Sequence, residues 1–404
     1  MTVEIGILIL GILLLAAVFS SKLADRFGVP ALLFFLGVGM LAGSEGIGGV
    51  EFDSPQIMQA IGSSALMVIL FAGGLETSWK NVRPVLAQGV VLSTVGVLVP
   101  MLLLASFAWF MLGTYTTFEL GTGGLSWTEA LLLAAIVSST DAAAVFSVFR
   151  TSKIQPRPHL RSILELESGS NDPMAILLTT TIIGVIMGTS GSVPSIIGGL
   201  LIQILFGGIV GGIVGWLGMK LINRMTLSAN GLYPILALAF GCLAFGLSDV
   251  SGGNSYLSVY IAGLVLGNGI KKRKTEILSF HDGLDSLMQI VMFIMLGLLV
   301  YPSQLLPVAG VSITIALFLM FVARPLSVFL CLSPFKMKKN EKLYISWVGL
   351  RGSVPIMLAT LPAMYGLEDA AMIFNVIFFI VLTSVFIQGL TLVPAAKWLK
   401  VTKD

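Results

Sequence analysis

Long apolar stretches, separated by short polar or Gly/Pro-rich segments, repeat along the whole 404-residue chain. A helix needs about 20 apolar residues to cross the hydrocarbon core of a bilayer, and most of the stretches reach that length. The pattern predicts thirteen membrane-spanning segments, at 4–22, 29–43, 56–75, 84–112, 127–149, 162–188, 194–219, 232–248, 255–269, 282–300, 304–332, 343–365 and 370–396. The second and ninth segments have only about fifteen residues each, so we expect them to tilt little or to span the membrane incompletely.

The distribution of basic residues supports this count, because Lys and Arg concentrate in cytoplasmic loops. Alternate loops contain 21 of the 23 basic residues, namely Lys22, Arg26, Lys80, Arg83, Arg150, Lys153, Arg157, Arg161, Lys220, Arg224, Lys271, Lys272, Arg273, Lys274, Lys336, Lys338, Lys339, Lys342, Lys397, Lys400 and Lys403. The opposite loops, such as 43–55 and 113–126, contain none. We therefore expect an external N-terminus and a cytoplasmic C-terminus.

The two remaining arginines, Arg324 and Arg351, fall inside expected membrane segments. A charge at the centre of a membrane helix costs at least about 2.5–3.5 kcal/mol, so each arginine needs an acidic or carbonyl partner. Composition agrees with the membrane assignment, since 56% of the residues are hydrophobic and only 11% are charged. Soluble domains have about a quarter charged residues. These values exclude a soluble protein, and nothing in the chain resembles a nucleic-acid-binding surface.

Six segments, a seventh and six more suggest two repeats of opposite orientation, at about 1–190 and 231–399, joined by a linker helix at about 194–222. The fifth segment of each half is interrupted, by Ser-Ser-Thr-Asp at 138–141 and by Gly-Leu-Arg-Gly-Ser-Val-Pro at 349–355. Such paired interruptions mark the substrate sites of secondary transporters. The expected fold is thus an all-α membrane protein with two inverted six-helix repeats and broken crossing helices.

Carboxylates are rare at membrane depth, and the central ones are Asp141, Glu167 and Asp172. Ser168 and Asp172 are four residues apart and share a helix face. A cation that loses its water needs replacement oxygens, and carboxylate, hydroxyl and carbonyl groups supply them. We expect Asp172 and Ser168 to bind a monovalent cation, joined by Thr140 and Asp141 if the fifth segment crosses the sixth here.

Several of these polar residues have a structural alternative. Glu167 can neutralise Arg351 or Arg324, and the residues alone do not decide between the two arginines. Asn171 is expected to cross-link the broken helix, and Asp141 is equally suited to bind the ion or to cap the half-helix that follows it.

A carboxylate in a cavity of low dielectric favours a neutral state, so a proton competes there with a cation. If Asp172 has either ligand in turn, the site is neutral in both forms and can move across the membrane. One such carboxylate predicts exchange of one cation for one proton with alternating access.

At these residues the sequence resembles the monovalent cation/proton antiporter superfamily, in its sodium/proton exchanger-like branch, over essentially the whole chain. Thr140-Asp141 and Ser168 with Asn171-Asp172 match the unwound-helix and ion-site motifs of that family, and Asn-Asp resembles its electroneutral members. The segments 139–146, 165–173, 331–335 and 347–355 are most similar to bacterial potassium/proton antiporters of the cell-volume-regulation type. The resemblance implies a homodimer in the bacterial inner membrane. It also implies that Glu167 holds the arginine of the 349–352 motif, Arg351.

Two departures from the family pattern stand out. Many relatives have an acid directly after the phenylalanine of the third segment, whereas Phe71 here precedes Ala72. Glu76 lies one turn further on, so we expect no third-segment carboxylate to reach the ion. The potassium group also has cytosolic regulatory domains after the membrane domain. We expect no such domain in this chain, which fits either a short member or part of a longer, regulated protein.

Other functions remain to be compared. A passive cation channel lacks support because no carbonyl-ring filter motif occurs, whereas a sodium/proton antiporter is an open alternative. An intramembrane enzyme would use Ser168 or Ser170, but both histidines, His159 and His281, fall at expected span ends. We therefore expect no enzyme and no cofactor, only transported K⁺ or Na⁺ and H⁺. Membrane lipid is the expected partner, although the basic residues at 271–274 are more simply a topogenic loop than a lipid or pH site.

Overall fold

The computed structural model describes residues 3–27, 30–50, 54–115, 124–152 and 154–402, and the regular elements in these ranges are helices. Eight helical stretches among these residues are long and apolar enough to cross a membrane, and α2, α7 and the pair α18–α19 are shorter apolar helices. The chain is thus a multi-pass membrane protein. Val29, Lys153 and Lys403, which belong to the expected second segment and to the basic loops, lie outside the described residues.

The first half of the described chain forms six helical segments, several of them interrupted. These are α1 (Val3–Phe27), α2 (Ala31–Ala42), α3 (Pro55–Glu76), the group α4 (Trp79–Val82), η1 (Arg83–Val85), α5 (Leu86–Ser93) and α6 (Val95–Leu112), the pair α7 (Trp127–Ile136) and α8 (Ala142–Ser152), and α9 (Pro158–Ile186). The long helix α10 (Val193–Arg224) then joins this half to the next.

The second half repeats the arrangement. Its segments are α11 (Leu232–Val250), α12 (Ser255–Gly269), α13 (Lys274–Leu299), the group α14 (Pro302–Leu305), η2 (Leu306–Val308), α15 (Ala309–Phe318), η3 (Leu319–Ala323) and α16 (Arg324–Leu332), the group α17 (Lys339–Trp347), α18 (Ser353–Leu358) and α19 (Leu361–Met364), and α20 (Ala370–Trp398). The thirteen expected segments are therefore all represented among the described residues.

Proline explains one interruption within these groups. η3 is a π-helical turn that ends immediately before Arg324 and Pro325. Pro325 has no backbone N–H and cannot make the regular helical hydrogen bond, so the turn widens there. In the first half the corresponding fourth segment is interrupted at Thr94, between α5 and α6.

Two helices are longer than their apolar stretches predict. α9 begins at Pro158 and α13 at Lys274, several residues before the expected starts at 162 and 282. Their first turns contain polar and charged residues, and a search for apolar stretches detects only the part of a helix that lipid or other helices cover. As a result, Asp282 and Asp285 lie within α13 and not at its end.

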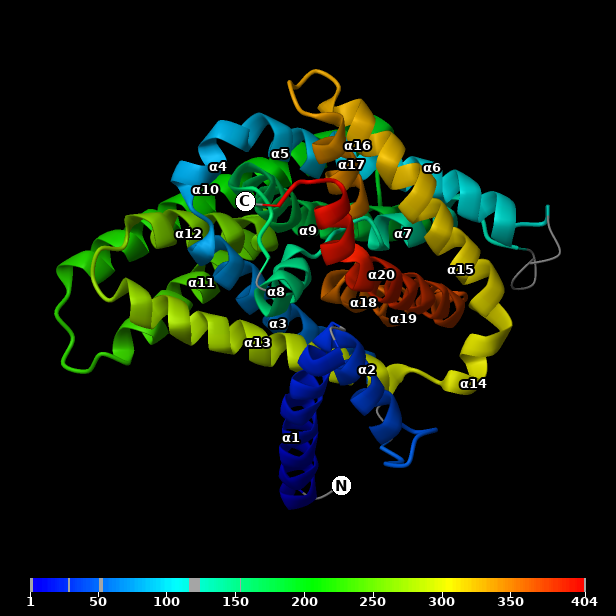
Figure 1. Cartoon of the computed structure of the whole chain (residues 1–404), viewed down its shortest axis with the longest axis horizontal. Coiled ribbons are helices and arrows are strands. Elements are labelled where there is room, and N and C mark those ends of the chain that lie inside the picture. The colour runs from blue at the N-terminus through cyan, green and yellow to red at the C-terminus, as the bar shows by residue number, and fades with distance from the viewer. Residues whose placement is uncertain (1–2, 28–29, 51–53, 116–123, 153, 403–404) are drawn as a thin grey trace.

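The helices form two bundles side by side (Figure 1). We call α4–α9 with α14–α20 the crossing bundle, and α1–α3 with α10–α13 the flanking bundle. Three segments of each half lie in each bundle, as expected for two inverted repeats. Close glycine contacts hold the flanking bundle together, since a Cβ at Gly74 of α3 would overlap the carbonyl oxygen of Tyr260 in α12. Such small-residue contacts are the usual way in which membrane helices pack.

The C-terminal end of α20 is tied to the loop before α9. The Arg157 backbone N–H donates to the Val401 carbonyl at 3.0 Å, and the Arg157 guanidinium bonds to Glu341 at 3.2 Å. The neighbouring residue, Pro156, lines the cavity described below. The basic loops and the chain end thus meet at the mouth of that cavity.

Candidate ion-binding site

Two unwound segments cross at the centre of the crossing bundle. α7 ends at Ile136 and α8 begins at Ala142, while α17 ends at Trp347 and α18 begins at Ser353. The two segments contact each other directly, since the Asp141 backbone N–H donates to the Leu350 carbonyl at 2.8 Å. Non-helical backbone at membrane depth must be satisfied by protein or water, and nearby side chains bond to several backbone groups of the first unwound segment.

Arg351 satisfies the C-terminal end of α7. Its Nη1 atom donates to the carbonyl oxygens of Ser138, at 2.7 Å, and Ser139. The guanidinium is 2% exposed, and it lies where the dipole of α7 places partial negative charge. The sequence required an acidic or carbonyl partner for Arg351, and the partner is a pair of carbonyls.

The sixth segment, α9, holds the first unwound segment in place through two side chains. The Asn171 amide donates to Thr140 Oγ1 at 2.7 Å and accepts from the Thr140 backbone N–H at 3.3 Å. The Ser168 hydroxyl donates to the Thr140 carbonyl at 2.8 Å and accepts from the Ala142 N–H at 3.0 Å. Asn171 and Ser168 thus replace hydrogen bonds that the broken helix has lost.

Asp141 caps the second half of the broken helix. Its Oδ1 atom accepts from the Ala144 N–H at 2.9 Å, and the N–H groups of Ala143 and Ser353 also interact with this carboxylate. Ser353 begins α18, so Asp141 lies at the N-terminal ends of two half-helices, where a negative charge is favoured. Asp141 also lines the cavity, and capping and ion binding are therefore compatible.

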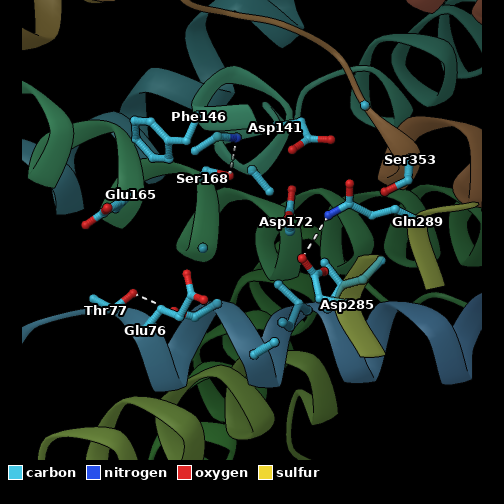
Figure 2. A pocket seen from close by; sticks show the side chains of 18 of the residues that line it. Glu76, Thr77, Asp141, Phe146, Glu165, Ser168, Asp172, Asp285, Gln289 and Ser353 are labelled. Atoms are coloured by element: carbon cyan, nitrogen blue, oxygen red, sulfur yellow. Dashed lines mark hydrogen bonds between the residues drawn. The ribbon is translucent and has the colours of Figure 1, made fainter. Parts of the chain in front are cut away.

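Asp172 is a buried acid with one oxygen that has no hydrogen-bond partner among the described residues. The side chain is 7% exposed, and Oδ1 has no hydrogen-bond partner in the described part of the protein. Figure 2 shows Asp172 on α9 at the wall of a cavity, beside Ser168 and facing α3 and α13. A buried carboxylate oxygen without a partner is costly, unless a proton or a cation occupies it.

The cavity lies between the two bundles and has a volume of about 190 Å³. Six carboxylates line it, those of Glu76, Asp141, Glu165, Asp172, Asp282 and Asp285, whereas Arg161 is the one basic side chain among the described lining residues. Arg161 bonds to Glu165 at 2.7 Å, so its charge is already offset. A cleft lined by charges of one sign concentrates ions of the opposite sign, which makes this cavity suited to cations.

Glu167 pairs with Arg324 rather than with Arg351. Arg324 Nη1 donates to Glu167 Oε1 at 2.5 Å, and both side chains are almost fully buried. The family resemblance assigned Glu167 to Arg351, and that assignment is wrong for the ion pair. The reason is geometric. The Arg351 guanidinium donates its hydrogen bonds to the Ser138 and Ser139 carbonyls, whereas Arg324, directly after the π-helical turn, lies against Glu167 of α9.

Comparison with known proteins agrees with this geometry. The family model described as "Sodium/hydrogen exchanger, transmembrane" matches residues 10–398. The chain belongs to this exchanger family.

Individual relatives extend the match. The chain is 43% identical over 399 residues to a protein named K(+)/H(+) antiporter NhaP from Alkalimonas amylolytica, which covers 98% of this chain and 67% of that one. It is 40% identical over 397 residues to K(+)/H(+) antiporter NhaP2 of Shewanella sp. strain ANA-3, covering 97% and 67%. The structure of the sodium proton antiporter MjNhaP1 from Methanocaldococcus jannaschii at pH 8 superposes with a TM-score of 0.82 at 26% identity, covering 97% of this chain and 99% of that chain. Fold and family therefore both indicate a cation/proton antiporter, and the family is one of transporters.

Within this exchanger fold, the structure brings most of the expected site residues together. Asp172, Asp141 and Ser168 line the cavity. Thr140 is not among the lining residues, and its hydroxyl and backbone are bonded to Asn171 and Ser168 behind the wall. In this structure Thr140 therefore supports the unwound segment through these hydrogen bonds and does not line the cavity.

The structure adds three lining residues that the sequence did not single out for the site. Asp285 and Gln289 of α13 bond to each other at 3.0 Å and face the cavity (Figure 2). Their spacing of four residues places them on one face of the helix, and this was the available signal. Glu76 of α3 also lines the cavity. The expectation that no third-segment carboxylate reaches the ion remains a prediction.

The crossing of the two unwound segments predicts a strict requirement for glycine at position 352. A Cβ there would overlap the Asp141 carboxylate, so Gly352→Ala should displace Asp141 and nearly eliminate ion exchange by the exchanger. Overpacking of this kind costs about 1–3 kcal/mol of stability. Exchange activity and thermal unfolding in detergent should both be measured.

Gly246→Ala on α11 is the matched control, because a Cβ there meets nothing within 4 Å. This variant should exchange ions normally. Normal exchange by Gly352→Ala as well would contradict the role of Asp141 at the crossing.

Proposed function

We propose that this exchanger moves potassium ions and protons in opposite directions, one for one, with Asp172 as the exchanging group. The observation that carries the proposal is the Oδ1 atom of this buried carboxylate, which has no hydrogen-bond partner in the described ranges of the chain, beside an acid-lined cavity. Potassium is proposed because the two relatives at 43% and 40% identity bear the name K(+)/H(+) antiporter. The same names favour antiport over a passive channel.

In this mechanism Asp172 binds either a proton or a dehydrated cation. Asp141 and Ser168, which line the same cavity, provide further oxygens for the cation. Thr140 and Asn171 support the site by fixing the unwound segment. Competition follows because both ligands need the same carboxylate, and neither can bind while the other is present.

The balance of buried charges supports an electroneutral cycle. At the centre of the crossing bundle, the negative charge of Glu167 is paired with the positive charge of Arg324. In the sum of formal charges, Asp141 then cancels Arg351. Asp172 then remains as one negative charge. One K⁺ or one H⁺ on Asp172 makes the bundle centre neutral, and a neutral centre can move through a membrane at the least electrostatic cost.

The two bundles provide the moving parts for alternating access. Asp172, Asp141 and Ser168 belong to the crossing bundle, whereas Glu76, Asp282 and Asp285 belong to the flanking bundle across the cavity. We propose that the crossing bundle moves against the flanking bundle with its bound ion, closing this cavity and opening the site to the other side.

Orientation and assembly belong to the same proposal. Arg157, just before α9, and Arg161, in the first turn of α9, lie on the cytoplasmic side under the positive-inside rule. The N-terminus is then external, and this conformation is open to the cytoplasm. We further propose a homodimer in the bacterial inner membrane. The expectation that this chain lacks the cytosolic regulatory domain of the potassium group remains a prediction.

The deciding experiment measures proton movement in proteoliposomes with a pH-sensitive dye and the membrane potential held at zero. Added K⁺ should drive proton efflux, and varying the clamped voltage should leave its rate unchanged. A response to Na⁺ alone would favour sodium/proton exchange, the activity for which the antiporter MjNhaP1 is named. Flux that depends on voltage but needs no counter-ion would favour a channel, and the absence of flux with either ion would reject the proposal.

A further inference from the structure

A second carboxylate, half-buried, faces the cavity from the opposite bundle. Asp285 lies on α13, more than two turns from the helix start at Lys274. Its Oδ2 atom accepts from the Gln289 amide at 3.0 Å, whereas Oδ1 is buried and has no hydrogen-bond partner among the described residues. Asp285 thus shares with Asp172 the feature that led to the proposed exchange site.

The two carboxylates are parts of one site. Both line the same cavity, Asp172 from α9 and Asp285 from α13. Figure 2 shows Asp172, Gln289 and Asp285 grouped around the same part of that space. Because Gln289 fixes one oxygen of Asp285, the other oxygen is held in a defined place.

A purely structural role does not account for Asp285. No basic side chain among the described lining residues is available to it, since Arg161 already bonds to Glu165. The charged groups that face it are carboxylates, those of Asp141, Glu76 and Asp282. A half-buried acid that faces other acids is unfavourable in its charged form, so its oxygens are suited to a cation or a proton that enters the cavity.

We propose that Asp285, positioned by Gln289, contacts the transported cation on its way between the cavity mouth and Asp172. This inference rests on the proposed antiport and deepens it. Asp285 belongs to the flanking bundle and does not move with Asp172, so the exchange of one cation for one proton is unchanged. The contact exists only while the site is open to the side of this cavity. Asp285 therefore raises the affinity for the cation on one side of the membrane only.

The test compares K⁺ dependence from each side, in everted and in right-side-out membrane vesicles. Asp285→Asn should raise the KM for K⁺ about tenfold on the side of the basic loops, which corresponds to about 1.4 kcal/mol. The maximal rate and the KM on the other side should stay within about twofold. Gln289→Leu, which frees Asp285 from its amide partner, should shift the same KM in the same direction.

Asp282→Asn is the matched control, because it removes the same charge from the same helix at an exposed residue that also lines the cavity. Its effect on KM should be much smaller. Equal shifts of the KM for K⁺ in Asp285→Asn and Asp282→Asn would mean that Asp285 only adds to a general attraction of cations, and would overturn the inference. An unchanged KM in Asp285→Asn, or a KM changed on both sides of the membrane, would overturn it as well. Active wild type with inactive Asp172→Asn establishes the proposed function independently, so failure of the Asp285 inference can be told apart from failure of the antiport.

Discussion

Replacing Asp172 by asparagine should reduce cation-driven proton exchange to the background of empty liposomes, while the protein remains folded. Asparagine has nearly the same shape but cannot ionise, so it cannot alternate between a proton and a cation. The fold should tolerate the change because Oδ1 of Asp172 makes no hydrogen bond to the described protein. Removing an unpaired buried charge can even stabilise a protein.

Flux in proteoliposomes and thermal unfolding in detergent should be measured on the same preparation. Asp369→Asn is a suitable control, since Asp369 lies at the N-terminal end of α20 and is not among the residues that line the cavity. This control should exchange ions at the wild-type rate. Normal transport by Asp172→Asn would rule out the mechanism based on competition at this carboxylate.

Replacing Arg324 by alanine should be the most destabilising of the changes considered. Arg324 and Glu167 form an ion pair that is nearly excluded from solvent, with side chains 3% and 1% exposed. Removing one partner of a buried pair leaves an uncompensated charge and typically costs about 3–5 kcal/mol. A lower yield of membrane-inserted protein and a lower unfolding temperature in detergent should follow.

A second substitution tests with which arginine Glu167 forms its ion pair. Glu167→Gln in the Arg324→Ala background removes the orphaned charge and should restore much of the yield and of the unfolding temperature. The same Glu167→Gln change should not rescue Arg351→Ala, because Arg351 bonds to the Ser138 and Ser139 carbonyls. Rescue in the Arg351 background and not in the Arg324 background would reverse the assignment.

The sequence by itself determined the number of helical segments and the place where the two unwound segments cross. Transfer of a segment into lipid depends on the summed apolarity of neighbouring residues, which is a local property that can be read along the chain. The unwound crossing was also predictable, because Ser-Ser-Thr-Asp at 138–141 and Gly352 with Pro355 interrupt the corresponding segments of the two halves. Asp172 and Ser168 share a face of α9 by their spacing alone.

Only the tertiary structure decided which distant groups meet. Glu167 and Arg324 are 157 residues apart, and both arginines were chemically acceptable partners until the helix packing placed one of them against carbonyls. Asp285 and Glu76 line the cavity because α13 and α3 lie across that space from α9. A polar residue near the end of an apolar stretch has no local signal for what it faces. Its role depends on the elements across the cavity, and these are set by the packing of the two bundles.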